Sequence, residues 1–135
     1  MHQHRELFER VRTRTSMYLP EETYTAVAAL VLGYDLACEG GVLVGFHEWM
    51  VVRLDAGSNL HWSALVLHAA FPSAKDVHKA VRASPKAQRH AIDTLFELLA
   101  EYDDARTKQD GLKAIFLAYD RWHHQQGIGD SPASD

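Results

Sequence analysis

Histidine is the residue type in this sequence most able to do chemistry, because nine imidazoles occur among 135 residues. Zinc ligands must converge on one ion, with histidine nitrogens about 2.1 Å from it. His61 and His68 share a helix face, but seven residues separate them by about 10 Å along the helix axis. No histidine pair has the i, i+4 spacing of a helical zinc site. We therefore expect no metal site and no cofactor.

Motifs of covalent or acid–base catalysis are also missing from the sequence. Paired catalytic carboxylates act across a cleft, whereas the acidic residues of 97–104 belong to one helix whose other face is apolar. Neither a nucleophile elbow nor a glycine-rich phosphate loop occurs. One cysteine, Cys38, excludes an intrachain disulfide and a cysteine-based zinc site. These patterns predict that the chain is not an enzyme.

The most unusual stretch of the sequence carries two tryptophans among charged and polar side chains. Trp49 and Trp62 could be core aromatics flanked by an arginine–carboxylate pair. They could also belong to a recognition surface, because Trp, Tyr and Arg dominate the binding energy of interfaces. The predicted partner-binding residues are Tyr18, Glu48, Arg53, His61 and Trp62. Under an alternative interpretation, Arg53, His61 and Glu48 line a pocket of a small enzyme or ligand-binding domain.

Composition limits the class of protein further. The chain is 47% hydrophobic and has a net charge of −4, which fits one globular domain and not a nucleic-acid binder. Its longest apolar run, residues 26–32, is far below the roughly 20 residues of a membrane span. The first residues contain no apolar signal region. We expect a cytoplasmic protein without membrane or nucleic-acid partners.

Apolar spacing predicts helices wherever the pattern is clear. The strongest pattern is in the helix expected at about 85–105, where apolar residues recur at helical spacing from Ile92 to Tyr102. Residues 44–55 favour a helix, with a strand as the rival interpretation. Residues 14–20 read as a connecting segment before a helix that begins at Glu21. The other expected helices cover 3–14, 21–39, 61–71, a short stretch ending near Arg82, and the residues after Asp110.

These elements predict an all-α fold with five to seven helices. Residues 1–126 form a single compact helical domain, and residues 127–135 form a flexible C-terminal tail. The break at 106–110 is short, so the last two helices should pack as a C-terminal antiparallel helical hairpin.

Five segments of the chain form a recognisable pattern: RTSMYL at 14–19, LGYDLA at 32–37, GFHEWMVVRL at 45–54, NLHW at 59–62 and FELLAEY at 96–102. The pattern resembles uncharacterised small bacterial proteins similar to immunity proteins of polymorphic toxin systems. The resemblance implies a binding protein that neutralises a cognate bacterial toxin by occluding its active site. It supplies no catalytic residues. A structural or regulatory homo-oligomer is the alternative, and the oligomeric state stays open.

Overall fold

The computed structural model describes residues 2–130, and every regular element in this part of the chain is an α-helix. The predicted all-α class is therefore confirmed. The helices are α1 (His2–Thr13), α2 (Thr15–Tyr18), α3 (Tyr24–Ala37), α4 (Phe46–Leu54), α5 (Trp62–Ala70), α6 (Val77–Val81), α7 (Pro85–Arg106) and α8 (Gly111–Asp130). None of them combines the length and the apolarity that a bilayer crossing requires.

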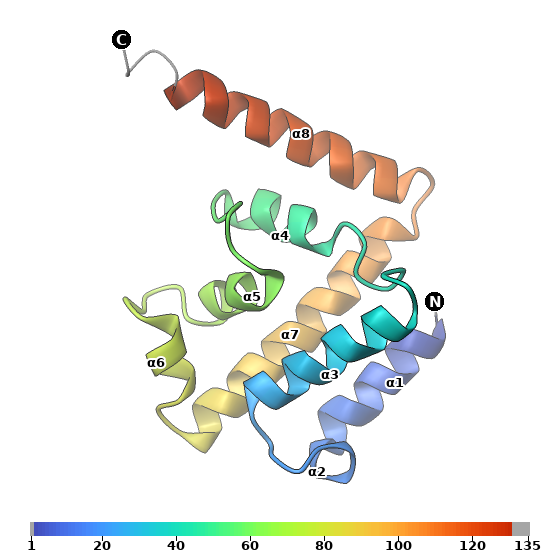
Figure 1. Cartoon of the computed structure of the whole chain (residues 1–135), viewed down its shortest axis with the longest axis vertical. Helices are drawn as coiled ribbons and strands as arrows, with labels where there is room; N and C mark the ends of the chain where they lie inside the picture. The colour runs from blue at the N-terminus through green and yellow to red at the C-terminus, as the bar shows by residue number, and fades with distance from the viewer. Residues whose placement is uncertain (1, 131–135) are drawn as a thin grey trace.

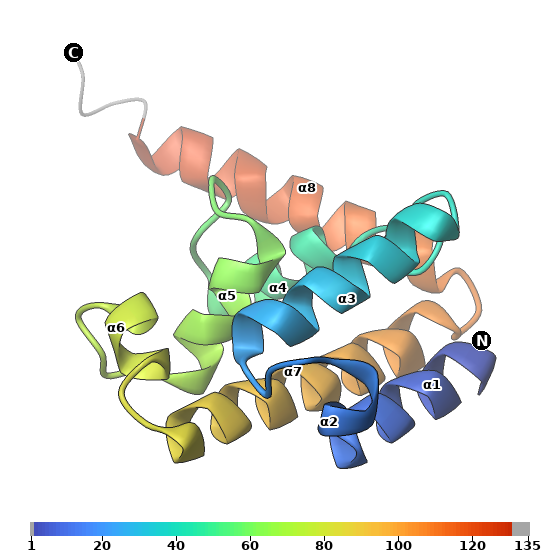
Figure 2. The same ribbon diagram turned by 60° about the horizontal axis from the view of Figure 1, so that its bottom comes forward.

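Helix α7 is the central element of the fold. Ser84 caps it by accepting a hydrogen bond from the Ala87 N–H, and Pro85 stands in the first turn, where a missing N–H costs nothing. Its buried residues recur from Ala91 to Tyr102 and occupy a broad face. Helices α1, α3, α4, α5, α6 and α8 all contact it. Figures 1 and 2 show α7 running through the molecule with these helices packed around it.

Helix α4 confirms the helical interpretation of residues 44–55. Phe46, Met50 and Val51 are fully buried and form its inner face. The Phe46 ring packs edge-on against Tyr102 of α7, with 5.2 Å between ring centroids. The Tyr102 hydroxyl donates a hydrogen bond to the Val44 carbonyl just before α4. The central helices α4 and α7 are thus joined by both an aromatic and a polar contact.

The described residues form eight helices, one more than the predicted range allows. The additional element is α2, a single turn within the segment that was expected to be only a connection. Helix α3 begins later than predicted, because the Thr23 side chain accepts a hydrogen bond from the Ala26 N–H and caps the helix there. A side-chain cap that bonds the backbone fixes a helix start better than acidic composition alone.

The predicted C-terminal hairpin is not confirmed. A tight turn joins α7 to α8, and a Cβ at Gly111 would lie 2.4 Å from the carbonyl oxygens of Ala105 and Arg106. Beyond that turn α8 diverges from α7 and packs mainly on α4 (Figure 1). Helix α8 continues to Asp130, and residues 131–135 of the predicted tail lie outside the described residues.

Helix α3 is not buried on all sides, although its sequence is apolar nearly all round. Tyr24, Val27 and Val31 face the core. Leu32 and Leu36 are exposed, Leu36 to 68%. The physical reason is the layering: α3 lies over α7, and no further described helix covers its outer side (Figure 2).

Candidate functional site

The corner between α1 and α2 is held by a network of side-chain hydrogen bonds. We call residues 14–18 the α2 corner. Thr15 begins α2 and is only 2% exposed. Its hydroxyl donates a 2.7 Å hydrogen bond to the Val11 carbonyl, which fixes the bend between the two helices. The polar side chain is therefore buried with its donor satisfied, as stable folds require.

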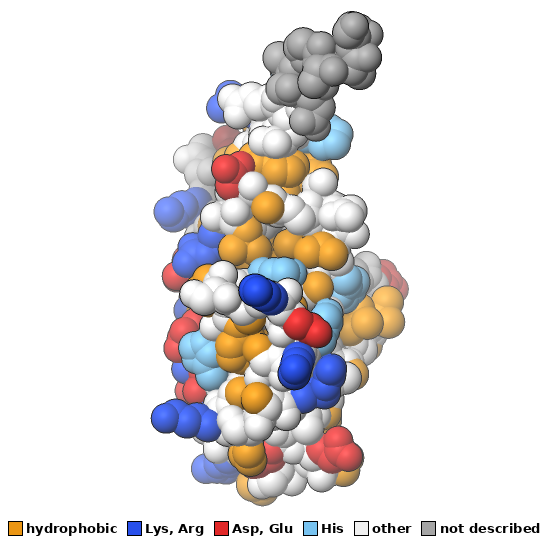
Figure 3. All heavy atoms as spheres, turned by 90° about the vertical axis from the view of Figure 1, so that its left-hand side faces the viewer, with side chains coloured by type: hydrophobic (Ala, Val, Ile, Leu, Met, Phe, Trp, Pro, Cys, Tyr) orange, Lys and Arg blue, Asp and Glu red, His pale blue; other side chains and the backbone are white. Residues whose placement is uncertain are grey.

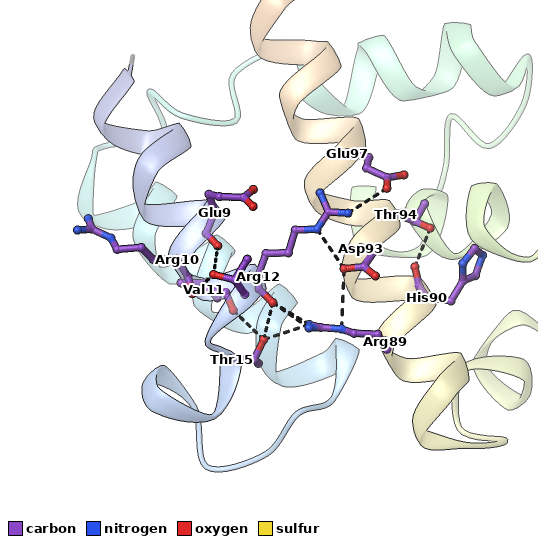
Figure 4. Close-up of polar contacts among 11 residues, drawn as sticks. Glu9, Arg10, Val11, Arg12, Thr15, Arg89, His90, Asp93, Thr94 and Glu97 are labelled. Carbon is purple, nitrogen blue, oxygen red and sulfur yellow. Dashed lines mark hydrogen bonds and ion pairs between the residues drawn. The ribbon is translucent and has the colours of Figure 1, made fainter.

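Arg89 of α7 holds this corner from the other side (Figure 4). Its two terminal nitrogens donate hydrogen bonds to the Arg12 carbonyl at 2.8 and 3.1 Å. One of them also donates to the Thr15 hydroxyl at 3.1 Å. The planar, five-donor guanidinium suits this arrangement, because it can bond several acceptors at once.

The Arg12 side chain points back toward α7 and makes two further contacts. Its Nε lies 3.1 Å from an Asp93 carboxylate oxygen, and its Nη2 lies 3.0 Å from a Glu97 oxygen (Figure 4). Partial burial opposes the charged form, but the hydrogen bonds and charges of Asp93 and Glu97 raise the pKa of Arg12 overall. Arg12 and Arg89 thus attach the end of α1 to α7 through interlocking contacts.

This framework presents two large side chains to solvent. Met17 is 74% exposed and Tyr18 is 43% exposed. Leu19 follows in extended geometry and packs against the core, so the segment is anchored on both sides. Met and Tyr are both enriched at protein interfaces, and a rigid presentation lowers the entropy lost on binding.

Two of the predicted binding residues lie on α4, and each already has a partner. The Glu48 carboxylate lies 3.3 Å from His47 Nδ1. Arg53 forms a 2.8 Å ion pair with Glu101 of α7, and its guanidinium lies 5.3 Å from the centre of the Trp49 ring. The arginine–carboxylate pair beside an aromatic, which was one interpretation of this stretch, is therefore present.

His61 and Trp62 are brought together at the start of α5. His61 is its N-cap residue, because its Nδ1 accepts a hydrogen bond from the Ser63 N–H at 3.2 Å. The two rings lie 5.0 Å apart, centroid to centroid. Trp62 is 7% exposed, so most of its ring serves the core. Tyr18 lies on α2, so the five predicted residues are spread over three helices.

The structure therefore does not support one pocket built from Arg53, His61 and Glu48. Each of them has a different neighbour, namely Glu101, Ser63 and His47. Within the described residues, no three His, Cys, Asp or Glu side chains are grouped as metal ligands would be.

Sequence reasoning missed Met17, Thr15 and Arg89. Met17 and Thr15 stand in the first segment of the sequence pattern, at 14–19, which was a usable signal. The sequence contains no local pattern that marks Arg89, because its hydrogen-bond acceptors, on Thr15 and Arg12, lie 74 and 77 residues earlier in the chain.

A small cavity of about 110 Å³ lies beside this region, between α1 and α7. Phe8, Phe96 and Leu99 line its apolar part. Two of the charged residues at its edge already have partners: Arg5 lies 2.7 Å from Asp104, and Arg106 donates to the carbonyls of Gly41 and Val42. The α2 corner, with its exposed apolar side chains, is the better candidate for a binding function.

In comparisons with known proteins, no family model, curated protein or solved structure matches this chain. Function is therefore inferred from the geometry of the chain itself.

Proposed function

We propose that this chain is an immunity-type binding protein of the cytoplasm, which neutralises a cognate bacterial toxin by covering its active site. The observation that carries the proposal is the α2 corner, where Met17 and Tyr18 are exposed on a turn that Arg89 fixes to the central helix. A turn held in this way can dock without first becoming ordered, which favours tight binding.

Occlusion needs no chemistry from the inhibitor. The protein docks on the toxin domain as a preformed surface and denies the substrate access to the active site. The exposure of Tyr18 supports its proposed partner-binding role. Glu48, Arg53 and His61 are proposed to contribute through their exposed edges. The net charge of −4 favours a basic toxin and mainly raises the association rate.

Co-expression with the toxin encoded beside this gene tests the proposal. The wild-type chain should restore growth and form a 1:1 complex of nanomolar affinity, about −12 kcal/mol. Tyr18→Ala and Met17→Ala should each weaken binding by about 2 kcal/mol or more, the range of an interface hot spot. Leu117→Ala on α8 is the matched control, because Leu117 is 45% exposed and lies on another helix.

Two results would count against the proposal. The first is continued toxin killing in the presence of the folded wild-type chain. The second is unchanged affinity in both corner variants, which would move the interface to another surface.

A further inference from the structure

A second surface of the molecule is a groove between α3, α5 and α6. Its volume is about 400 Å³. The apolar lining includes Leu32, Trp62, Leu67 and Val81. The lining also includes two histidines and one arginine, His61, His78 and Arg82. We call this feature the α3–α6 groove.

One wall of this groove is the apolar side of α3 that the fold leaves uncovered. Ala29 and Leu32 of that wall are exposed, and Leu36 continues the same side one helical turn further on. Apolar residues that a monomer leaves open in a row at helical spacing are typical of an interaction surface. The α2 corner uses none of these residues, so the groove is a separate feature.

The residues in and around α6, beside the groove, carry a basic excess, although the whole chain is acidic. Residues 75–86 contain Lys75, Lys79, Arg82 and Lys86 and one acidic residue, a net charge of +3, and all four basic residues are exposed. His78, which lines the groove, falls in the same segment. Figure 3 shows histidine and basic side chains beside apolar ones in the middle of the face on which α6 lies.

The acidic residue of this segment, Asp76, is already used by the fold. Its carboxylate accepts hydrogen bonds from the N–H groups of His78 and Lys79 and caps α6. These backbone hydrogen bonds, that of Lys79 foremost, lower the pKa of Asp76. Among the ion pairs of the described residues, none involves Lys79 or Arg82. Their charges can therefore act on a ligand, although that of Arg82 also contributes to lowering the pKa of the Asp76 carboxylate.

His61 adds a directed donor to the rim. Because its Nδ1 accepts a hydrogen bond from the Ser63 N–H, the neutral ring carries its proton on Nε2. The same Nδ1 lies 2.8 Å from the Ser63 hydroxyl, which holds the ring in place. The free ring edge of His61 can thus donate to a carboxylate in the groove.

The walls of the groove are joined by a buried tyrosine. The Tyr24 hydroxyl of α3 donates a 2.7 Å hydrogen bond to the Ser63 carbonyl of α5. The Tyr24 N–H donates to the Gln88 side chain of α7, also at 2.7 Å. The groove is therefore built in advance and does not need to open when a ligand arrives.

From this combination we infer that the α3–α6 groove binds an acidic amphipathic polypeptide segment of a partner protein. Apolar side chains of the segment pack on Leu32 and Trp62, and its carboxylates meet Arg82, His78 and His61. A nucleic acid fits less well, because the lining is mainly apolar and the chain as a whole repels phosphates. Where the partner is the proposed toxin, we expect the toxin to carry an acidic patch that contacts the groove. The proposal for the groove does not depend on toxin neutralisation.

The test uses the full-length chain and a pair of fluorescently labelled peptides. One peptide contains only Glu and Leu, and its control has Lys in place of every Glu. The acidic peptide should bind with an affinity in the range of about 1–100 μM, and the basic peptide should bind at least about tenfold more weakly. Backbone NMR shifts should change at His61, Trp62 and Arg82 when the acidic peptide is added.

Two charge reversals separate local recognition from general electrostatics. Arg82→Glu, in the groove, should weaken the acidic peptide by about tenfold or more. Lys113→Glu makes the same change in net charge on an exposed site of α8 and should have little effect. Circular dichroism on both variants checks that they remain folded.

Several outcomes would overturn the inference. Equal binding of both peptides, or no binding at about 1 mM, contradicts an acid-selective groove. Equal losses in the two charge variants mean that only the net charge of the protein affects binding.

Two further outcomes would assign the groove to another occupant. Binding of single-stranded RNA in preference to the acidic peptide assigns the surface to nucleic acid. A dimer in light scattering that Leu36→Ser dissociates would make a second copy of this chain the occupant. None of these results bears on the rescue of growth, so failure of the groove and failure of the proposed function are distinguishable.

Discussion

The guanidinium of Arg89 donates two hydrogen bonds to the carbonyl oxygen of Arg12, at 2.8 and 3.1 Å. This contact joins the central helix to the end of α1 across 77 residues of sequence. It also satisfies a carbonyl that the end of a helix leaves without an intrahelical partner. The contact fixes the turn on which Met17 and Tyr18 are exposed.

Replacing Arg89 should loosen the α2 corner and destabilise the fold. Arg89→Ala removes three hydrogen bonds from a charged donor, so we expect a loss of about 1–3 kcal/mol in the free energy of unfolding. Arg89→Lys keeps the charge but cannot reproduce the planar fork, and should recover less than half of the loss. Urea denaturation measures both effects. An Arg89→Ala variant as stable as the wild type would contradict the assigned role.

Asp35 should be one of the most sensitive polar positions of the chain. Its Oδ1 accepts hydrogen bonds from the buried N–H groups of Val42 and Leu43, at 3.0 and 2.8 Å. Asp35→Ala leaves both donors unsatisfied and should cost about 3 kcal/mol, whereas Asp35→Asn keeps an acceptor oxygen and should cost about 1 kcal/mol. Thermal unfolding compares the two variants. Equal losses would show that the charge matters and the hydrogen bonds do not.

Two glycine substitutions should have opposite effects on stability. Gly57 has φ of +85°, and a Cβ there would lie 2.5 Å from the Leu65 side chain. Gly57→Ala should therefore destabilise the protein by about 1–3 kcal/mol. Gly33 is an exposed residue inside α3, and no atom lies within 4 Å of its added Cβ. Gly33→Ala should stabilise by about 0.5–1 kcal/mol. Chemical denaturation of both variants checks the signs.

Stability should fall at alkaline pH through Tyr102. Burial raises the pKa of Tyr102 to about 12, against the opposing effect of the nearby Arg106 charge. The unfolded chain ionises near pH 10, so this contribution is complete below pH 10 and is lost as the pH rises from 10 to 12. The loss should reach about 2 kcal/mol. Urea midpoints on either side of pH 10 measure it.

Tyr102→Phe is the control for the alkaline transition. This variant lacks the ionisable group at position 102, so its stability should decline less steeply above pH 10. Burial also raises the pKa of Tyr24. Ionisation of Tyr24 should therefore still lower the stability of the Tyr102→Phe variant at alkaline pH. An identical pH profile in both proteins would contradict the assignment to Tyr102.

Arg53 and Glu101 should be coupled only weakly. Their 2.8 Å ion pair lies at the surface, where such pairs contribute about 0.2–1 kcal/mol. A double-mutant cycle with Arg53→Ala and Glu101→Ala measures this coupling without the contribution of the Trp49 ring. If Arg53 also serves a partner, Arg53→Ala should reduce affinity by more than it reduces stability. A coupling energy of zero would show that the two side chains lie close together without stabilising each other.

Much of the helical content could be predicted from the sequence, because helix periodicity is a local property. The apolar spacing from Ile92 to Tyr102 predicts the central helix, and Ser84 with Pro85 predicts where it begins. The single turn of α2 escaped this reasoning, since its start depends on the buried Thr15 hydroxyl. Helix α3 shows a second limit: its sequence is apolar nearly all round, but its burial depends on which helices are available to cover it.

The sequence by itself determined the all-α class and the positions of the long helices, because local spacing, caps and glycine breaks govern both. Tertiary structure alone decided which side chains meet. It placed Arg89 on the Arg12 carbonyl, paired Arg53 with Glu101, and turned Trp62 into the core. The physical reason is that these contacts join residues far apart in the chain, and their energy arises only once packing has brought them together.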